Sequence, residues 1–201
     1  MTPRPAATVM LLRDGGDGDG DDGSTGGGGL ELLMVRRTPA AQFMGGHWVF
    51  PGGALDPADG VGQPGLMAAA IRELQEEAGV ALPPDTELVA FSRWITPPEL
   101  SIRFDTWSYL AVAPTDANPA VDGSEIVDFR WLAPAQALTQ FEAGELVLAF
   151  PTRTQLEQLS AFESADELLA HARGRPIEPI KPHVVGTGEH ARIVLPADRG
   201  H

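Results

Sequence analysis

The sequence predicts an α+β fold in which helices flank a mixed β-sheet. Apolar segments of strand length are interspersed with segments in which apolar residues recur every three or four positions, the period of an amphipathic helix. The two kinds of segment do not alternate regularly enough for repeated βαβ units. The 201 residues, 43% of them hydrophobic, suffice for one domain with a substantial core. We therefore expect a single domain over residues 1–201, with residues 134–201 as a C-terminal helical extension and arm.

The chain begins with two predicted strands, residues 6–13 and 30–37, which are rich in valine, leucine and methionine. Residues 14–29 between them consist almost entirely of glycine and aspartate. Such a segment has nothing to bury, so we expect a mobile loop that decorates a hairpin. Aspartate-rich loops can bind calcium, but the spacing here matches no EF-hand.

A helix is predicted over residues 65–79, because Leu66, Ala70, Leu74 and Ala78 recur at helical spacing and Gly79 is a natural stop. The other predicted elements are strands over residues 88–95, 103–113 and 126–132, and helices over residues 134–141 and 152–173. Residues 176–201 are interrupted by prolines and glycines, and we expect them to form an irregular arm that packs over the domain.

The composition excludes several classes of protein. The net charge is −14, and Lys181 is the one lysine among 14 basic residues, so we expect no nucleic-acid partner. No run of about eighteen apolar residues could span a membrane, and no secretory signal is visible. Cysteine is absent, which fits the cytoplasm and removes thiolate chemistry. A divalent cation would screen the charge of an anionic substrate. The sequence does not fix the oligomeric state, and a homodimer stays open.

Three glutamates crowd one face of the predicted helix. Glu73 and Glu77 are one turn apart, Glu76 lies on the adjoining strip, and apolar residues occupy the opposite side. Like charges this close raise one another's pKa unless a cation lies among them. Mg²⁺ prefers such oxygen ligands and bridges to substrate phosphates. The alternative for three glutamates alone is a solvated acidic surface.

A pair of glycines lies upstream of this helix. Phe50-Pro51-Gly52-Gly53 follows an apolar stretch, and paired glycines let the backbone approach a ligand or metal closely. Alone, the motif would also fit an ordinary tight turn. In combination with the acidic helix, it favours a metal site over both alternatives.

Together these segments resemble the Nudix box. The family pattern is glycine, five residues, glutamate, seven residues, then Arg-Glu-apolar-x-Glu-Glu-x-Gly-apolar, and residues 72–80 match every fixed position of its second half. Six positions after Gly53 stands Asp59 instead of glutamate, and twelve residues instead of seven separate it from Arg72. We interpret the difference as a five-residue insertion, residues 60–64, which lengthens the loop before the helix and leaves the role of Asp59 open.

The resemblance implies a Nudix-type α/β/α sandwich and a hydrolase that cuts a pyrophosphate linkage with Mg²⁺, for which Mn²⁺ could substitute. Water would attack one phosphorus and the other phosphate would leave. By position, the metal ligands would be Glu73, Glu77 and the Gly52 carbonyl, with Glu76 supporting them or a second ion.

The same resemblance implies catalytic roles for Glu76, Glu125 and Arg72. Arg72 would hold the acidic cluster in place by charge pairing with Asp59 or Glu76. Family members place the general base differently. Glu125 is a candidate, because it stands just before a predicted strand, where many members carry an acid, although a surface residue would fit there equally. The substrate-binding candidates are Gly53, Arg37, Arg93 and Arg103. Each of the three arginines would fit equally as an exposed residue at the end of a strand.

A second resemblance concerns the substrate. Arg37-Thr38, Gly46 and the segment from Phe50 to Gly53 look like the signature upstream of the box in coenzyme A-cleaving Nudix enzymes, with Gln42 where that signature has arginine. We expect a small nucleotide substrate, in the first place coenzyme A or its acyl esters. The alternatives are dinucleotides such as NADH or ADP-ribose, and a Nudix fold used only as a ligand-binding module, which the intact glutamates disfavour.

Overall fold

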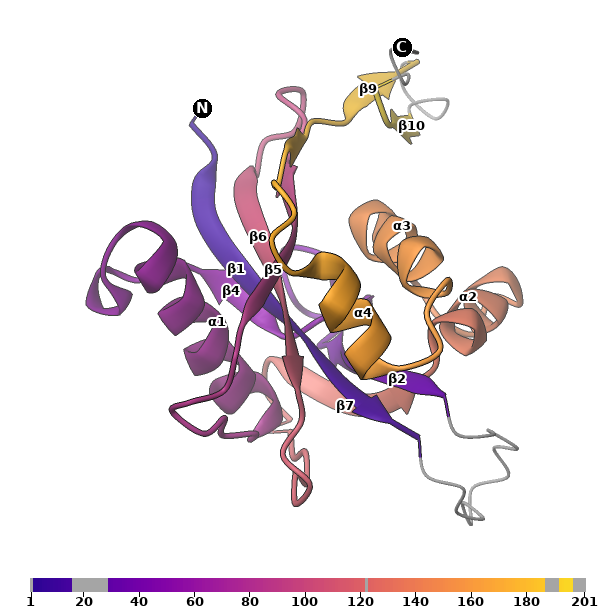
Figure 1. Cartoon of the computed structure of the whole chain (residues 1–201). Coiled ribbons are helices and arrows are strands. Elements are labelled where there is room, and N and C mark those ends of the chain that lie inside the picture. Colours follow the sequence, from indigo (N-terminus) through magenta and orange to yellow (C-terminus); the bar gives the residue numbers. More distant parts are fainter. Residues whose placement is uncertain (1, 16–28, 122, 187–191, 197–201) are drawn as a thin grey trace.

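The computed structural model describes residues 2–15, 29–121, 123–186 and 192–196 (Figure 1). Its centre is an 8-stranded mixed sheet in the order β3-β2-β1-β6-β5-β8, with β4 paired to β1 and β7 paired to β2. Its strands are β1 (Arg4–Asp14), β2 (Leu30–Arg37), β3 (Trp48–Val49), β4 (Gly52–Ala54), β5 (Val89–Ile95), β6 (Phe104–Val112), β7 (Ile126–Leu132) and β8 (Pro179–Ile180). β1 runs parallel to β6 and β5 parallel to β8, whereas the other pairs are antiparallel.

Helices cover both faces of this sheet. The helices are α1 (Gly62–Ala78), α2 (Pro134–Glu142), α3 (Phe150–Leu159) and α4 (Ala165–Ala172), and a 3-10 helix η1 (Pro57–Asp59) precedes α1. Figure 1 shows α1 on one side of the sheet and α2, α3 and α4 on the other. The predicted α+β fold with an α/β/α arrangement is therefore confirmed. None of the helices among the described residues is long and apolar enough to cross a membrane.

The two helical layers follow from the alternation of side chains along β1. Val9 and Leu11 belong to a core cluster that includes residues of α1, such as Leu74. Met10 and Leu12 belong to a second cluster, formed with α2, α3 and α4. Because successive side chains of a strand point to opposite faces, an apolar strand of this kind needs a cover on each side.

The helix predicted over residues 152–173 is wrong as a single element. The chain leaves the α-helical conformation after Leu159, and Ser164 begins α4 by accepting a hydrogen bond from the Glu167 N–H at 3.2 Å. Apolar residues continue at helical spacing through the break, so periodicity alone could not reveal it. The irregular arm predicted after residue 176 is also partly wrong, because β8 joins the sheet, and β9 (His183–Val185) and β10 (Arg192–Val194) pair as a two-stranded sheet.

The inserted residues do not lengthen the loop as predicted. α1 begins at Gly62, so Gly62, Gln63 and Pro64 form its first turn. The buried Tyr109 hydroxyl donates a 2.6 Å hydrogen bond to the Gln63 side chain, which ties this turn to β6. Residues 16–28, most of the predicted mobile loop, lie outside the described residues.

Candidate active site

The two glycines of β4 lie where a side chain would collide with a neighbouring element. A Cβ atom on Gly53 would overlap the carboxylate of Glu73, and one on Gly52 would overlap the backbone of Ala7 and Thr8. Antiparallel pairing to β1 fixes the position of both glycines. The absence of side chains at Gly52 and Gly53 therefore leaves room for the Glu73 carboxylate beside β4 and for β4 beside β1.

Glu77 is the buried member of the acidic cluster, with 5% of its side chain exposed. Its carboxylate accepts a 2.8 Å hydrogen bond from the Gly52 N–H and lies 3.7 Å from the Arg37 guanidinium. Burial raises the pKa of Glu77 to about 7, and the charges of Glu73 and Glu125 add to the rise, whereas Gly52 and Arg37 oppose it. A carboxylate in this state is stabilised by any further positive charge that reaches it.

Arg72 is the organising cation behind the cluster. Its guanidinium donates to both oxygens of Asp59 at 3.0 and 2.9 Å, to Glu73 at 2.8 Å, to Glu76 at 2.9 Å and to the Ala54 carbonyl at 3.2 Å. The hydrogen bond from Arg72 lowers the pKa of Asp59. The role of Asp59 that the sequence left open is thus a structural one, the orientation of Arg72.

Glu73 and Glu76 differ in their surroundings. Burial raises the pKa of Glu73, and Arg72 opposes the rise. Glu76 is 58% exposed and contacts Arg72 on the outer side of the helix. The two glutamates lie on adjacent strips of α1, but only Glu73 lines the cavity.

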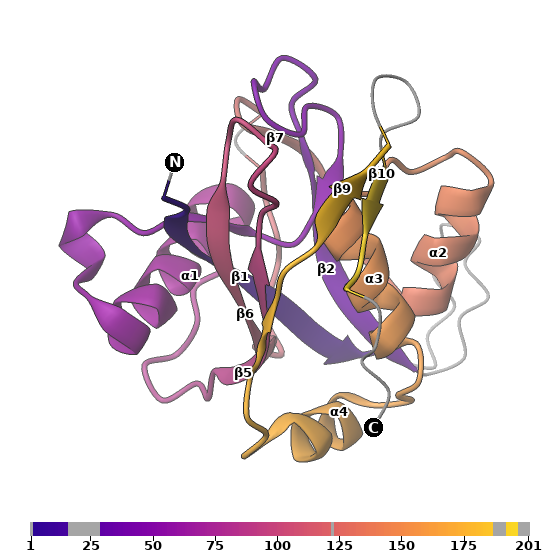
Figure 2. The ribbon, with the colours of Figure 1, turned by 90° about the horizontal axis from the view of Figure 1, so that it is seen from above.

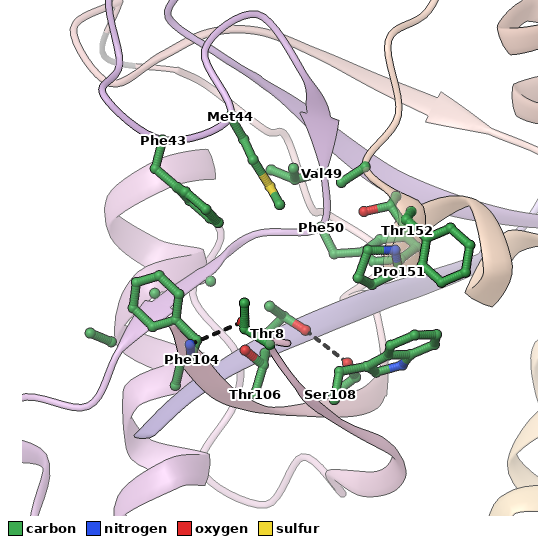
Figure 3. Close-up of a pocket in the computed structure, with 18 of the residues that line it drawn as sticks. Thr8, Phe43, Met44, Val49, Phe50, Phe104, Thr106, Ser108, Pro151 and Thr152 are labelled. Atoms are coloured by element: carbon green, nitrogen blue, oxygen red, sulfur yellow. Dashed lines mark hydrogen bonds between the residues drawn. The ribbon is translucent and has the colours of Figure 1, made fainter. Parts of the chain in front are cut away.

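A cavity of about 590 Å³ opens beside the cluster. Glu73, Glu77 and Glu125 line it together with Gly52 and Gly53. Figure 3 shows its other side chains, which are mostly apolar: Phe43 and Phe104 on one side, and Phe50 and Pro151 on another. The cavity therefore joins an acidic end to an apolar interior.

The floor of the cavity is a row of side chains on two parallel strands. Arg4, Ala6 and Thr8 of β1 are paired with Phe104, Thr106 and Ser108 of β6, and all six residues line the cavity. Beyond Thr8 and Ser108, the next residues on this face, Met10 and Leu110, are fully buried core. Pairing of the strands thus sets where the floor begins and where it ends.

The C-terminal part of the chain supplies another wall. Phe150, Pro151, Thr152 and Gln155, at the start of α3, line the cavity together with residues of the tail. Phe150 meets Trp94 of β5 edge to face, with ring centroids 6.2 Å apart. The Gln155 amide oxygen accepts a 3.2 Å hydrogen bond from Ser92, which holds α3 above β5.

Comparison with known proteins identifies the family. Residues 2–149 match the model of the NUDIX domain. The chain belongs to the Nudix family. It is 29% identical over 192 residues to putative nudix hydrolase 7 of Caenorhabditis elegans, covering 78% of this chain and 64% of the relative. It is 28% identical over 183 residues to the human acyl-coenzyme A diphosphatase NUDT19, covering 85% of this chain and 46% of that protein. This Nudix chain thus spans less than two thirds of these relatives.

A solved Nudix structure has the same fold over nearly its whole length. The crystal structure of a NUDIX hydrolase from Alicyclobacillus acidocaldarius superposes with a TM-score of 0.73 at 26% identity, covering 88% of this chain and 99% of that one. The Nudix resemblance inferred from residues 72–80 is confirmed, and the Caenorhabditis elegans relative and the solved structure are both named as Nudix hydrolases. The match to the family model ends at residue 149, so the wall formed by α3 and the tail lies beyond it.

The Nudix fold brings six of the predicted site residues to one cavity: Glu73, Glu77, Gly52, Gly53, Glu125 and Arg37. The other four do not line it. Arg72 and Glu76 lie behind the cluster, as described above. Arg93 forms a bidentate ion pair with Asp105 at 2.8 and 2.7 Å and lines a smaller cavity of about 190 Å³. Arg103 donates to the Thr96 carbonyl at 3.2 and 3.1 Å.

Sequence reasoning missed the hydroxyl groups of the cavity. Thr8, Thr106, Ser108 and Thr152 line it, but single hydroxyl residues in strands belong to no motif. A weak signal existed, because Thr106 and Ser108 interrupt an otherwise largely apolar strand at the two-residue period of one face. Polar residues on a face that should be buried indicate a cavity or a buried hydrogen bond.

The donors at the acidic end suit a hard divalent cation. They are carboxylate oxygens, which Mg²⁺ and Mn²⁺ prefer. Burial raises the pKa of Glu77 although Arg37 and the Gly52 N–H oppose the rise, so its negative charge is only partly compensated. Among the described residues, no three His, Cys, Asp or Glu side chains are already gathered closely enough to hold a metal ion. Glu73 and Glu76 instead contact Arg72, so a cation would compete with this arginine for Glu73.

Proposed function

We propose that this Nudix protein hydrolyses the diphosphate linkage of a nucleoside diphosphate derivative with Mg²⁺, and that its substrate is coenzyme A or an acyl-coenzyme A. One observation carries the proposal: a single cavity of about 590 Å³ joins three carboxylates to an interior that is largely apolar. A diphosphate needs the first feature, and an uncharged, flexible group attached to it needs the second. The name of the human relative, an acyl-coenzyme A diphosphatase, supports this choice of substrate.

In this proposal Glu73, Glu77 and the Gly52 carbonyl hold Mg²⁺, or Mn²⁺ in its place, and Glu76 on the outer side supports a second ion. When bound, the cation neutralises phosphate charge and makes water a stronger nucleophile. Arg72 acts indirectly, because its contacts with Asp59 and Glu73 orient the acidic cluster.

Other side chains of the cavity bind the substrate and move the proton. Arg37 lines the cavity 3.7 Å from Glu77, so it is the candidate to contact the diphosphate oxygens. Glu125 is exposed at the cavity and accepts the proton of the attacking water. The new bond joins the water oxygen to one phosphorus, and the bridging P–O bond breaks so that the second phosphate leaves with its electron pair. Gly53 leaves room for the carboxylate of Glu73.

A cytoplasmic location and a homodimer stay predictions from the sequence.

The test is a comparison of kcat/KM for coenzyme A, NADH and ADP-ribose with Mg²⁺ under one set of conditions. We expect coenzyme A to be preferred, with 3′,5′-ADP and 4′-phosphopantetheine as products identified by mass. If NADH or ADP-ribose is preferred tenfold or more, a dinucleotide replaces coenzyme A as the substrate. If none is cleaved with Mg²⁺ or Mn²⁺ although one of them binds, the fold serves as a binding module.

A further inference from the structure

The register of the sheet defines a direction across the cavity. Gly52 of β4, Thr8 of β1, Ser108 of β6 and Ser92 of β5 are aligned in one row across the four strands. Neighbouring strands lie about 4.8 Å apart, so Ser108 is roughly 10 Å from Gly52. A ligand whose diphosphate lies beside Gly52 can therefore extend across the floor toward β5 and α3.

The charged residues among the described lining of the cavity lie away from the far end of this row. The charged residues that line the cavity are Arg4, Arg37, Glu73, Glu77 and Glu125. Four of them gather near β4, as the contacts of Glu77 show, and Arg4 lies at the outer end of β1 beside Phe104. Among the residues that the structure describes, no charged lining residue is therefore available at Ser108 to compensate a second charged group, and burial of such a group would be costly.

Hydroxyl groups near Ser108 can donate hydrogen bonds to a ligand. The Thr8 hydroxyl donates to the Ser108 hydroxyl at 3.2 Å. Two hydroxyls carry two protons and only one can lie between them, so the pair retains one proton for an acceptor. The structure gives the Thr152 hydroxyl no hydrogen-bond partner within its described residues, although Thr152 is only 6% exposed and lines the cavity. Figure 3 shows Thr152 across the cavity from Thr8 and Ser108.

The surrounding walls are apolar and aromatic. Phe50 belongs to β4's side of the cavity, whereas Trp94 and Phe150 form the edge-to-face pair on the β5 side, next to Pro151. The indole N–H of Trp94 is buried and lacks a hydrogen-bond partner among the described residues. Buried donors in native proteins are usually paired, so this end favours a ligand that brings acceptors between apolar segments.

We propose that Thr8, Ser108 and Thr152, with Trp94 and Phe150, form a subsite for the group attached to the diphosphate, and that this group is an uncharged chain in which amides alternate with methylene segments. Pantetheine is such a chain. Amide carbonyls accept from the hydroxyls, and methylenes pack on the aromatic rings. The inference rests on the proposed function for the orientation of the substrate, with its diphosphate at Gly52.

Part of this subsite lies outside the family domain. Phe150 and Thr152 come after residue 149, where the match to the NUDIX model ends. Pro182 and Ile193 of the tail also line the cavity. Figure 2 shows the β9–β10 pair over the part of the molecule that contains α3. The segment after the family domain thus completes the pocket for the attached group.

The test uses free pantetheine, which has no phosphate, as the probe. Its binding to the full chain is measured by calorimetry at millimolar concentrations in EDTA, so that the metal centre contributes nothing. We expect binding to wild-type protein, and a rise in Kd of about three- to tenfold in Ser108→Ala and in Thr152→Val, the effect of one lost hydrogen bond. Ser160→Ala removes an exposed hydroxyl at the other end of α3 and should leave Kd unchanged.

A second readout separates this subsite from the chemistry. In Ser108→Ala and Thr152→Val, KM for coenzyme A should rise several-fold, whereas kcat changes less than twofold. Melting temperatures identify a variant that does not fold, and the other variant then decides. Wild-type protein that fails to bind pantetheine, or variants with unchanged Kd and KM, would overturn the subsite even if coenzyme A is cleaved. Hydroxyl-dependent pantetheine binding without cleavage of coenzyme A would uphold the subsite and refute the proposed function.

Discussion

Arg72 holds Asp59 through two hydrogen bonds, 3.0 Å from Nε to Oδ1 and 2.9 Å from the terminal nitrogen to Oδ2. A 3-10 turn brings Asp59 to this position: Asp59 accepts from the Asp56 N–H at 2.8 Å, and Asp56 accepts from the Ala58 N–H at 2.8 Å. The insertion that follows Asp59 continues into the first turn of α1. Although Asp59 replaces the glutamate of the family pattern and an insertion follows it, Arg72 still has a carboxylate partner.

We predict that Asp59→Asn weakens the acidic cluster without abolishing the fold. Arg72 would lose a charged partner and contact Glu73 and Glu76 more strongly, so a metal ion would compete less well for Glu73. Because Arg72 is 30% exposed, we expect a loss of about 1–2 kcal/mol in the free energy of unfolding and a higher Mg²⁺ concentration at half-maximal turnover. Urea unfolding and a Mg²⁺ titration measure the two effects.

The control for Asp59→Asn is Glu31→Gln, which removes a comparable partner from Arg13 on the surface, at 2.7 Å. It should change stability by less than about 1 kcal/mol and leave the Mg²⁺ titration unchanged. Equal effects of the two substitutions would contradict a special role for Asp59.

Glu77→Gln should retain the fold but lose divalent-ion binding and most turnover. The amide oxygen can still accept the hydrogen bond from Gly52, but it brings no negative charge to a cation. Calorimetric titration with Mn²⁺ and the rate of coenzyme A cleavage are the measurements, with the exposed Glu157→Gln as the matched control. Turnover close to that of the wild type would rule out Glu77 as a metal ligand.

The stability of the metal-free protein should depend on pH through Glu77. Its pKa is about 7 in the folded chain, above the ordinary 4.5, so the folded state binds more protons between these values. The free energy of unfolding therefore falls as the pH rises through this window, by on the order of 3 kcal/mol from this residue. Urea unfolding in EDTA from about pH 5 to pH 8 should show this loss in wild-type protein and not in Glu77→Gln. Parallel curves for the two proteins would refute the assignment.

Gln42→Arg should improve the cleavage of coenzyme A. Gln42 is exposed in the turn before Phe43 and Met44, which line the cavity. A charge-assisted contact with the 3′-phosphate is worth about 1 kcal/mol more than a neutral one, so kcat/KM should rise several-fold. Dephospho-coenzyme A, which lacks this phosphate, should show no gain, and Gln158→Arg, which adds the same charge on the exposed side of α3, should show none with either substrate. An equal gain with both substrates would exclude the 3′-phosphate as the group contacted.

The sequence predicted those elements whose structure depends on their own residues and not on contacts with distant parts of the chain. The predicted strands 30–37 and 126–132 coincide with β2 and β7, and α1 ends at the glycine that the sequence indicated. The break between α3 and α4 was not predictable, because no proline or glycine marks it. The pairing of β8 with β5 also depends on contacts across the fold, which a two-residue strand cannot reveal.

The candidate site divides in the same way. The motif identified the cluster of Glu73 and Glu77 beside Gly52, because the spacing of one helix and one turn fixes it. The pairing of Arg93 with Asp105 depends on the register of β5 and β6, so the sequence could not show that this guanidinium already has a partner. The hydroxyls on β1 and β6 likewise meet only when distant strands are aligned.

The NUDIX domain and the residues that follow it both contribute to the cavity wall. Substitutions in the domain and substitutions after residue 149 should therefore have different effects. Substitutions around Phe150 and Thr152 alter the shape of the pocket without contact to the carboxylates. Under the proposed function, the choice of attached group would then depend on this segment, whereas the type of bond cleaved would depend on the carboxylates. A chimera that joins residues 1–149 of this chain to the C-terminal segment of a relative should cleave the same type of bond and inherit the relative's preference for the attached group.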